Sequence, residues 1–208
     1  MAYRLKIVEL DKIPPAEEFL TKTEMETYKA FKIEKRKKEW LGGRYALKML
    51  ACDLFNFGIK YIEVKNLASG KPVLLVPGGT KLPVSITHRG PYAAAAIALT
   101  GQSIGVDIEV VEQRSPAWVK QCFDKKEISS KSASFLTELW AKKEAVLKFL
   151  GVGLKLSCTD INFVFGKLEF QGKALDTWAK QGSPNITLTV QDLEGSYKLA
   201  LATEEPLF

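Results

Sequence analysis

Two acidic residues alternate with apolar ones in the segment 104–110, and this pattern constrains the fold more than any other in the chain. Val106, Ile108 and Val110 alternate with Asp107 and Glu109, which is the period of a β-strand that buries one face. Carboxylates two residues apart on a strand point to the same side, so Asp107 and Glu109 can share a divalent cation. Acidic side chains are depleted in strands, so two of them beside an apolar face require a counter-charge. The alternative is a solvated face on an edge strand.

A second segment, residues 139–148, can bring a third carboxylate and a cation to the same place. Its residues have high helix propensity. Trp140, Glu144 and Lys148 recur every four residues, so they form one stripe on the helix. The alternative is an exposed Glu144 that pairs with Lys148 on the helix surface.

Together, these two segments resemble the signatures of the 4′-phosphopantetheinyl transferase family, which read G-(V/I)-D-(I/V)-E and (W/F)-x-x-K-E-(A/S)-x-x-K. They stand here at 105–109 and 140–148, and the second runs on into Gly151, Gly153 and Leu154, which matches the family's K-x-x-G-x-G-L continuation. The resemblance covers most of the chain, from Arg44 to Leu154. It implies an enzyme that transfers the 4′-phosphopantetheine group of coenzyme A to a serine of an apo acyl or peptidyl carrier protein, releasing adenosine 3′,5′-bisphosphate.

The resemblance also implies a role for each acidic and basic residue of these motifs. Asp107, Glu109 and Glu144 would hold Mg²⁺, a hard cation that takes oxygen ligands and keeps places for water and phosphate. Glu144 would also accept the serine proton, directly or through a water. Lys148 would offset charge on the phosphoryl group, because phosphoryl transfer depends mainly on positioning and electrostatics. Lys143 is interpreted as either a solvated charge or a minor catalytic contributor.

Four other residues match positions that bind coenzyme A in this family. Arg44 belongs to a G-R-x-x-x-(K/R) helix motif, and Lys71 to a G-K-P turn. Thr87 and His88 match (N/S)-(I/L)-S-H-(S/x)-G, with Thr87 in place of the usual serine and Arg89 where a small residue is commoner. Without the resemblance, the motifs are explained by a basic helix face, an ordinary turn and a structural histidine.

The composition restricts the class of protein. A chain of 208 residues with 46% hydrophobic content can bury a core, as one domain or as two fused small ones. It has no apolar run of ~18 residues and no signal-peptide pattern, so we expect no membrane span. Cys52, Cys122 and Cys158 lack metal-ligand spacing, which predicts reduced thiols in a cytoplasmic protein. The net charge of +6 indicates an acidic partner, a protein or a polyphosphate, and no nucleic-acid-binding motif is visible.

Two other functions remain open from the sequence. A non-catalytic module could hold carrier proteins or coenzyme A, although such a module needs none of the acidic residues of a metal site. A basic nucleic-acid-binding protein is the second alternative, and a salt-dependent gel shift tests it.

The expected elements alternate in a repeated order. We predict a strand at 3–8, a helix capping box at Thr23–Glu26, a long helix at 34–55, strands at 61–65 and 84–88, helices between 114 and 150, and strands at 160–165, 167–170, 186–190 and 197–202. The resemblance makes 92–99 a strand in a hairpin with the Asp107 strand. It implies an α+β fold of two similar subdomains, 1–100 and 101–208, related by a pseudo-twofold axis with the active site in the cleft between them. It also implies a monomer.

Phe123 and Glu127 fit a looser F-x-x-x-E pattern and are predicted scaffold contacts, with Glu127 a candidate for orienting the site.

Overall fold

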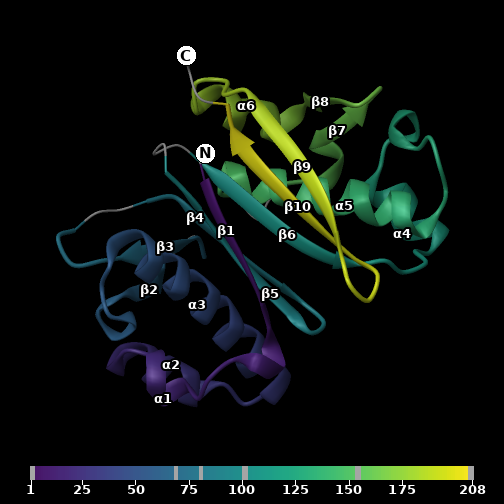
Figure 1. The fold of residues 1–208 in the computed structure, drawn as a ribbon. Coiled ribbons are helices and arrows are strands. Elements are labelled where there is room, and N and C mark those ends of the chain that lie inside the picture. The colour runs from purple at the N-terminus through teal and green to yellow at the C-terminus, as the bar shows by residue number, and fades with distance from the viewer. Residues whose placement is uncertain (1–2, 68–69, 80–81, 100–102, 153–155, 206–208) are drawn as a thin grey trace.

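The computed structural model of the protein describes residues 3–67, 70–79, 82–99, 103–152 and 156–205. They form a mixed α+β fold (Figure 1). The N-terminal half contains β1 (Tyr3–Glu9), η1 (Leu10–Lys12), α1 (Ala16–Phe19), α2 (Lys22–Ala30), α3 (Glu34–Phe55), η2 (Ile59–Tyr61), β2 (Glu63–Asn66), β3 (Pro72–Leu75), β4 (Val84–Arg89) and β5 (Tyr92–Ala98). The C-terminal half contains β6 (Ile104–Val110), α4 (Pro116–Cys122), η3 (Lys125–Glu127), α5 (Ala133–Leu150), η5 (Cys158–Asp160), β7 (Ile161–Val164), β8 (Lys167–Phe170), α6 (Gly172–Lys180), β9 (Ile186–Leu193) and β10 (Tyr197–Glu204).

The two halves have the same sheet topology. The first sheet has the order β1-β5-β4 and the second has the order β6-β10-β9, so each half places its last strand between its first and its penultimate strand. Each half also has a separate two-stranded sheet, β2-β3 in one and β7-β8 in the other. This repetition confirms an α+β fold of two similar subdomains. The boundary near Gly101 lies outside the described residues and stays a prediction.

The elements stack as helix, sheet, sheet and helix (Figure 1). Strand β5 is buried on both faces, with Ala95 and Ile97 packed in a cluster with α3, and Ala94 and Ala96 packed against the second sheet. Small side chains let both neighbours approach, so tertiary packing overrides the low strand propensity of alanine. The predicted hairpin between 92–99 and the Asp107 strand is wrong. Strand β5 pairs with β1 and β4, and β6 pairs with β10.

Two hydroxyl side chains of β4 join the halves. The backbone N–H of Val106 donates to Ser85 Oγ (3.0 Å) and that of Ile108 donates to Thr87 Oγ1 (3.2 Å). Strand β6 is the outer strand of its sheet, so its free N–H groups need acceptors from outside the sheet. The hydroxyls of β4 supply them on either side of Asp107.

A buried ion pair fixes the long helix of the C-terminal half. Lys143 Nζ lies 2.8 Å from Glu127 Oε2, and both side chains are inaccessible to solvent. Glu127 also accepts from the backbone N–H groups of Asp124 (2.8 Å) and Phe163 (2.8 Å). The interpretation of Lys143 as a solvated charge is therefore wrong, because this lysine ties α5 to η3 and β7. Breaking such a pair leaves an uncompensated buried charge.

The N-terminal half repeats this arrangement with different residues. Lys48 of α3 lies 2.6 Å from Glu24 Oε2, and Glu24 also accepts from the backbone N–H groups of Thr21 (2.9 Å) and Val64 (2.9 Å). Thr21 and Glu24 form the capping box of α2. The capping box predicted at Thr23–Glu26 is therefore displaced by two residues. The T-x-x-E pattern occurs at both Thr21–Glu24 and Thr23–Glu26, and the burial of Glu24 favours the first.

Most predicted elements are present within a few residues of their expected bounds, including the long helix at 34–55. The helices α1 and α6, the strand β3 and the short 3-10 helices η1, η2 and η5 were not predicted. Among the described residues, no helix is long and apolar enough to cross a membrane. The three cysteines are free thiols.

Candidate active site

Helix α5 reaches β6 because Gly105 has no side chain. A Cβ at this position would lie 1.9 Å from the carbonyl oxygen of Ala145 and 2.6 Å from the amide nitrogen of Phe149. Both atoms belong to the backbone, so no rotamer change relieves the clash. This close approach places Lys148 of α5 directly over Asp107, two residues beyond Gly105.

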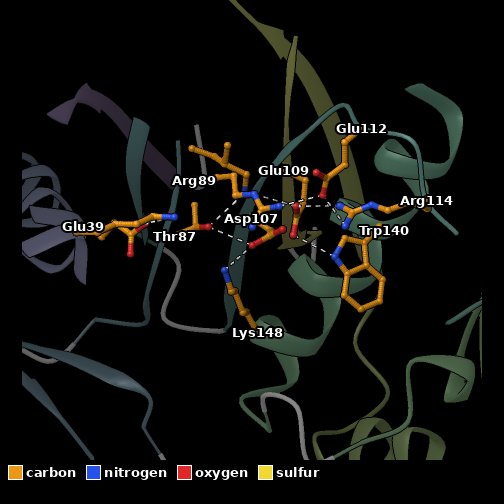
Figure 2. A network of polar contacts seen from close by, with 11 residues as sticks. Glu39, Thr87, Arg89, Asp107, Glu109, Glu112, Arg114, Trp140 and Lys148 are labelled. Atoms are coloured by element: carbon orange, nitrogen blue, oxygen red, sulfur yellow. Dashed lines mark hydrogen bonds and ion pairs between the residues drawn. The ribbon is translucent and has the colours of Figure 1, made fainter. Parts of the chain in front are cut away.

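Asp107 is buried at the junction of the two halves (Figure 2). Its Oδ1 accepts from Lys148 Nζ (2.7 Å) and from Thr87 Oγ1 (3.1 Å), and Lys148 also donates to the carbonyl of Val106 (2.9 Å). The Oδ2 atom is buried without a hydrogen-bond partner among the described residues. An unpaired buried carboxylate oxygen is costly, which favours a cation at this position.

Glu144 has the same property. Its Oε1 is buried and has no hydrogen-bond partner in the described part of the chain. Burial, followed by the negative charge of Asp107, raises the pKa of Glu144 to about 7, and the ammonium of Lys148 offsets part of this effect. Two carboxyl groups with unpaired oxygens therefore lie near each other beside one lysine.

Glu109 is fully engaged by protein donors (Figure 2). Trp140 Nε1 donates to its Oε1 (3.0 Å), while its Oε2 lies 3.3 Å from Arg114 and 3.5 Å from Arg89. Burial and the charge of Asp107 raise the pKa of Glu109, and the two arginines and Trp140 act in the opposite direction.

The three predicted metal ligands thus differ. Asp107 and Glu144 have unpaired oxygens, and Glu109 has none. Within the described ranges, no group of three or more His, Cys, Asp and Glu side chains is arranged to hold a metal ion. The donor set therefore fits a cation held by two protein carboxylates, with water and phosphate oxygens completing the shell, as is usual for Mg²⁺.

A cleft of about 860 Å³ adjoins this cluster. It lies between the start of α3, the turn before β3 and the end of β4, and its lining includes Arg36, Trp40, Arg44, Asn66, Gly70, Pro72, His88 and Arg89. Arg44 is buried, donates to Asn66 Oδ1 (3.1 Å) and lies 4.6 Å over the ring of Trp40. No carboxylate of the described residues lies within 4.0 Å of it, and burial lowers its pKa to about 10. A buried cation without an acidic partner on a pocket wall favours an anionic ligand.

The other predicted ligand-binding residues also lie near this cleft. His88 lines it, with Nδ1 3.6 Å from Glu39 Oε2, and burial lowers the pKa of its imidazole. Lys71 lines an adjoining pocket of about 230 Å³ with Lys148 and Gly151. The hydroxyl of Thr87 is already used by Asp107 and Ile108. Gly153 and Leu154 lie outside the described residues.

Arg114 and Glu112 are neighbours of the site that the sequence motifs did not indicate. Arg114 pairs with Glu109, and Glu112 pairs with Arg114 (Figure 2). The only signal in the sequence is the cluster of charges directly after β6, which is equally typical of a solvated loop.

Comparisons with known proteins agree with the motifs. Residues 103–202 match the family model described as the 4′-phosphopantetheinyl transferase superfamily. The holo-[acyl-carrier-protein] synthase of Bacillus subtilis is 38% identical over 95 residues, which cover 40% of this chain and 75% of that protein. The human L-aminoadipate-semialdehyde dehydrogenase-phosphopantetheinyl transferase is 27% identical over 158 residues, 67% of this chain and 51% of that protein. A crystal structure of a holo-(acyl-carrier-protein) synthase from Bacillus anthracis in complex with CoA (3′,5′-ADP) is 28% identical, covers 46% of this chain and 92% of that chain, and has a TM-score of 0.41.

Proposed function

The chain belongs to the 4′-phosphopantetheinyl transferase superfamily, and from this premise we propose that it transfers the 4′-phosphopantetheine group of coenzyme A to a serine of an apo acyl or peptidyl carrier protein. The second product is adenosine 3′,5′-bisphosphate. One observation carries the proposal. Asp107, Glu144 and Lys148 meet where the two halves join, beside a cleft whose wall contains a buried arginine that forms no ion pair with an acid of the described residues.

Coenzyme A occupies the cleft in this proposal. A volume of about 860 Å³ suits a nucleotide with its pyrophosphate. Arg44 binds a phosphate, because an anion restores the charge balance that the protein leaves open. His88 donates a hydrogen bond to a phosphate, and Lys71 reaches the nucleotide from the adjoining pocket. The hydroxyl of Thr87 can donate to the ligand only if its hydrogen bond to Asp107 breaks.

A divalent cation, Mg²⁺, is proposed at the unpaired oxygens of Asp107 and Glu144. When bound, it supplies positive charge that offsets the charge of the pyrophosphate. Glu109 is the third residue that the family motif implies. It adds an oxygen only when its pairing with Arg89 and Arg114 opens.

In the proposed reaction, Glu144 and Lys148 act on the proton and on the charge that move during transfer. The serine oxygen of the carrier forms a bond to the phosphorus that bears the pantetheine arm, and the bond from that phosphorus to the bridging oxygen breaks. The electron pair leaves with adenosine 3′,5′-bisphosphate. Glu144 accepts the serine proton, directly or through a water, and a pKa near 7 suits a base at neutral pH. Lys148 offsets negative charge that develops during transfer.

The carrier protein is proposed to dock beside Arg114. There a groove of about 790 Å³ is lined by apolar side chains that include Val119, Phe123 and Leu136, and by one acid, Asp124, and four lysines, Lys120, Lys125, Lys126 and Lys131. Such a groove suits a helix with an apolar stripe and acidic flanks. Arg114 links the groove to the site, since it also pairs with Glu109.

The protein is proposed to work as a monomer. Thr87 from the N-terminal half and Asp107 from the C-terminal half already meet within one chain. Light scattering during gel filtration, with and without coenzyme A, tests this point.

Intact mass spectrometry of several apo carrier proteins, after incubation with the enzyme, coenzyme A and Mg²⁺, tests the activity. We expect a mass gain of one phosphopantetheine group on the carrier. A carrier whose acceptor serine is alanine should stay unmodified. Carriers or coenzyme A that bind without any mass gain, with all carriers and metals tried, would instead support a non-catalytic binding module.

A further inference from the structure

Arg89 stands where the family motif usually has a small residue, and in the structure its guanidinium group pairs with two glutamates. Its Nε lies 3.5 Å from Glu109 Oε2 and its Nη2 lies 3.1 Å from Glu112 Oε1. Arg114 pairs with the same two acids, at 3.3 Å from Glu109 and 2.7 Å from Glu112. Two arginines and two glutamates therefore form a closed ring of alternating charge (Figure 2).

The two sides of this ring differ in how firmly they are held. Arg114 and Glu109 are 16% and 14% exposed, and Arg114 also stacks 4.7 Å over the ring of Trp118. Arg89 and Glu112 are 41% and 43% exposed. Arg89 is thus the arginine that can leave Glu109 with the smaller loss of packing, and it also lines the cleft.

This ring affects whether Glu109 can bind a metal ion. Glu109 lies two residues from Asp107 on the same strand, yet Trp140 occupies one of its oxygens and the arginines occupy the other. A carboxylate held by two guanidinium groups is a poor ligand for a divalent cation, since the cation must displace a charge-assisted bond.

We propose that Arg89 competes with the divalent cation for Glu109 and thereby weakens metal binding in this protein. This inference rests on the proposed metal site at Asp107 and Glu144. It makes Arg89 a positioning residue that acts through Glu109, as the more exposed of the two arginines that pair with Glu109 Oε2.

Binding of Mn²⁺ to the protein without coenzyme A or carrier, followed by the electron paramagnetic resonance signal of free Mn²⁺, tests the proposal. Releasing this ion pair predicts that Arg89→Ala binds Mn²⁺ between about threefold and tenfold more tightly than the wild type. Arg89→Lys keeps the charge and should stay close to the wild type. Arg36→Ala is the matched control, because Arg36 lines the same cleft and forms no ion pair with Glu109 among the described contacts.

A double variant separates competition from simple charge repulsion. If Arg89 acts through Glu109, then Glu109→Gln changes Mn²⁺ affinity little in the wild type and removes the gain in the Arg89→Ala background. An equal gain in both backgrounds, or an equal gain in Arg36→Ala, overturns the competition. Unchanged affinity in a folded Arg89→Ala variant overturns it as well, while leaving the transferase proposal intact. Absence of Mn²⁺ binding to every variant would refute the metal site and this inference together.

Discussion

Glu144 costs the folded protein stability at neutral and alkaline pH, and replacement by glutamine should remove that cost. The pKa of Glu144 is raised from its ordinary 4.5 to about 7, mainly by burial and then by the charge of Asp107. At 1.36 kcal/mol for each pKa unit, this difference corresponds to at most about 3.4 kcal/mol. The side chain is only partly buried, so solvent screening reduces the expected gain for Glu144→Gln to about 1.5–2 kcal/mol.

The sign of the pH dependence follows from proton binding. Between pH 4.5 and 7 the folded protein holds a proton on Glu144 that the unfolded chain has lost, so the free energy of unfolding falls as pH rises through this window. Below pH 4.5 both states are protonated and the penalty is absent. Above pH 7 both states are ionised and the penalty is constant. The advantage of Glu144→Gln should therefore be near zero at pH 4.5 and reach its full size at pH 8.

Urea denaturation of the metal-free protein in chelator, from pH 4.5 to 9, measures this difference. Glu138→Gln is the matched control on the same helix, because Glu138 is a half-exposed acid that pairs with Lys142 (2.6 Å). Its effect should be small. Excess Mg²⁺ should then stabilise the wild type and leave Glu144→Gln almost unchanged, since binding to the folded state adds to stability. A pH-independent difference between wild type and Glu144→Gln would refute the assigned burial and repulsion.

Four other perturbations test the remaining assignments. Asp107→Asn should lower carrier modification at least about a hundredfold in a mass assay, and near-normal turnover at ordinary Mg²⁺ would contradict its role. Gly105→Ala should lower the free energy of unfolding by about 3 kcal/mol in urea, because the added Cβ meets backbone atoms, and an unchanged midpoint would contradict the close packing. Arg44→Ala and His88→Ala should weaken coenzyme A more than 3′-dephospho-coenzyme A in calorimetry, and equal losses would assign them to another part of the ligand. Raising salt should lower kcat/KM for the carrier at saturating coenzyme A, since exposed charges are screened beyond ~8–10 Å, and a flat response would leave apolar contacts as the main recognition element.

The sequence predicted the parts of the site that lie on regular elements. Alternation placed Asp107 on a strand, and a spacing of four placed Glu144 and Lys148 on one helix face, so their convergence required only that the strand and helix pack together. Gly105 is the residue that permits this packing, and its role as the contact point with α5 is evident only from the structure. Asp107 is buried, which the alternation along the strand does not reveal.

Other features depend on tertiary contacts that local patterns do not record. Lys143 and Lys48 sit among other lysines in charge-rich helices, and only the fold shows which of them is buried against a glutamate. The sequence of strand β5 is rich in alanine and would fit a helix equally well. Burial on both faces favours the strand. One of the two arginines that pair with Glu109, Arg89, comes from another sheet.

The two halves also explain why the chain has one acidic cluster and not two. Strand β6 holds the same place in its sheet that β1 holds in the other, as the outer partner of the last strand. On alternate positions β6 carries Asp107 and Glu109, whereas β1 carries the cations Arg4 and Lys6. The buried lysine–glutamate pair recurs in both halves because each half must fix its long helix, and this need is structural. The acids do not recur because the proposed site, which lies where β4 of one half meets β6 of the other, needs only one set. Repetition of the ion pair therefore reflects the fold, and the asymmetry of the strand charges reflects the function.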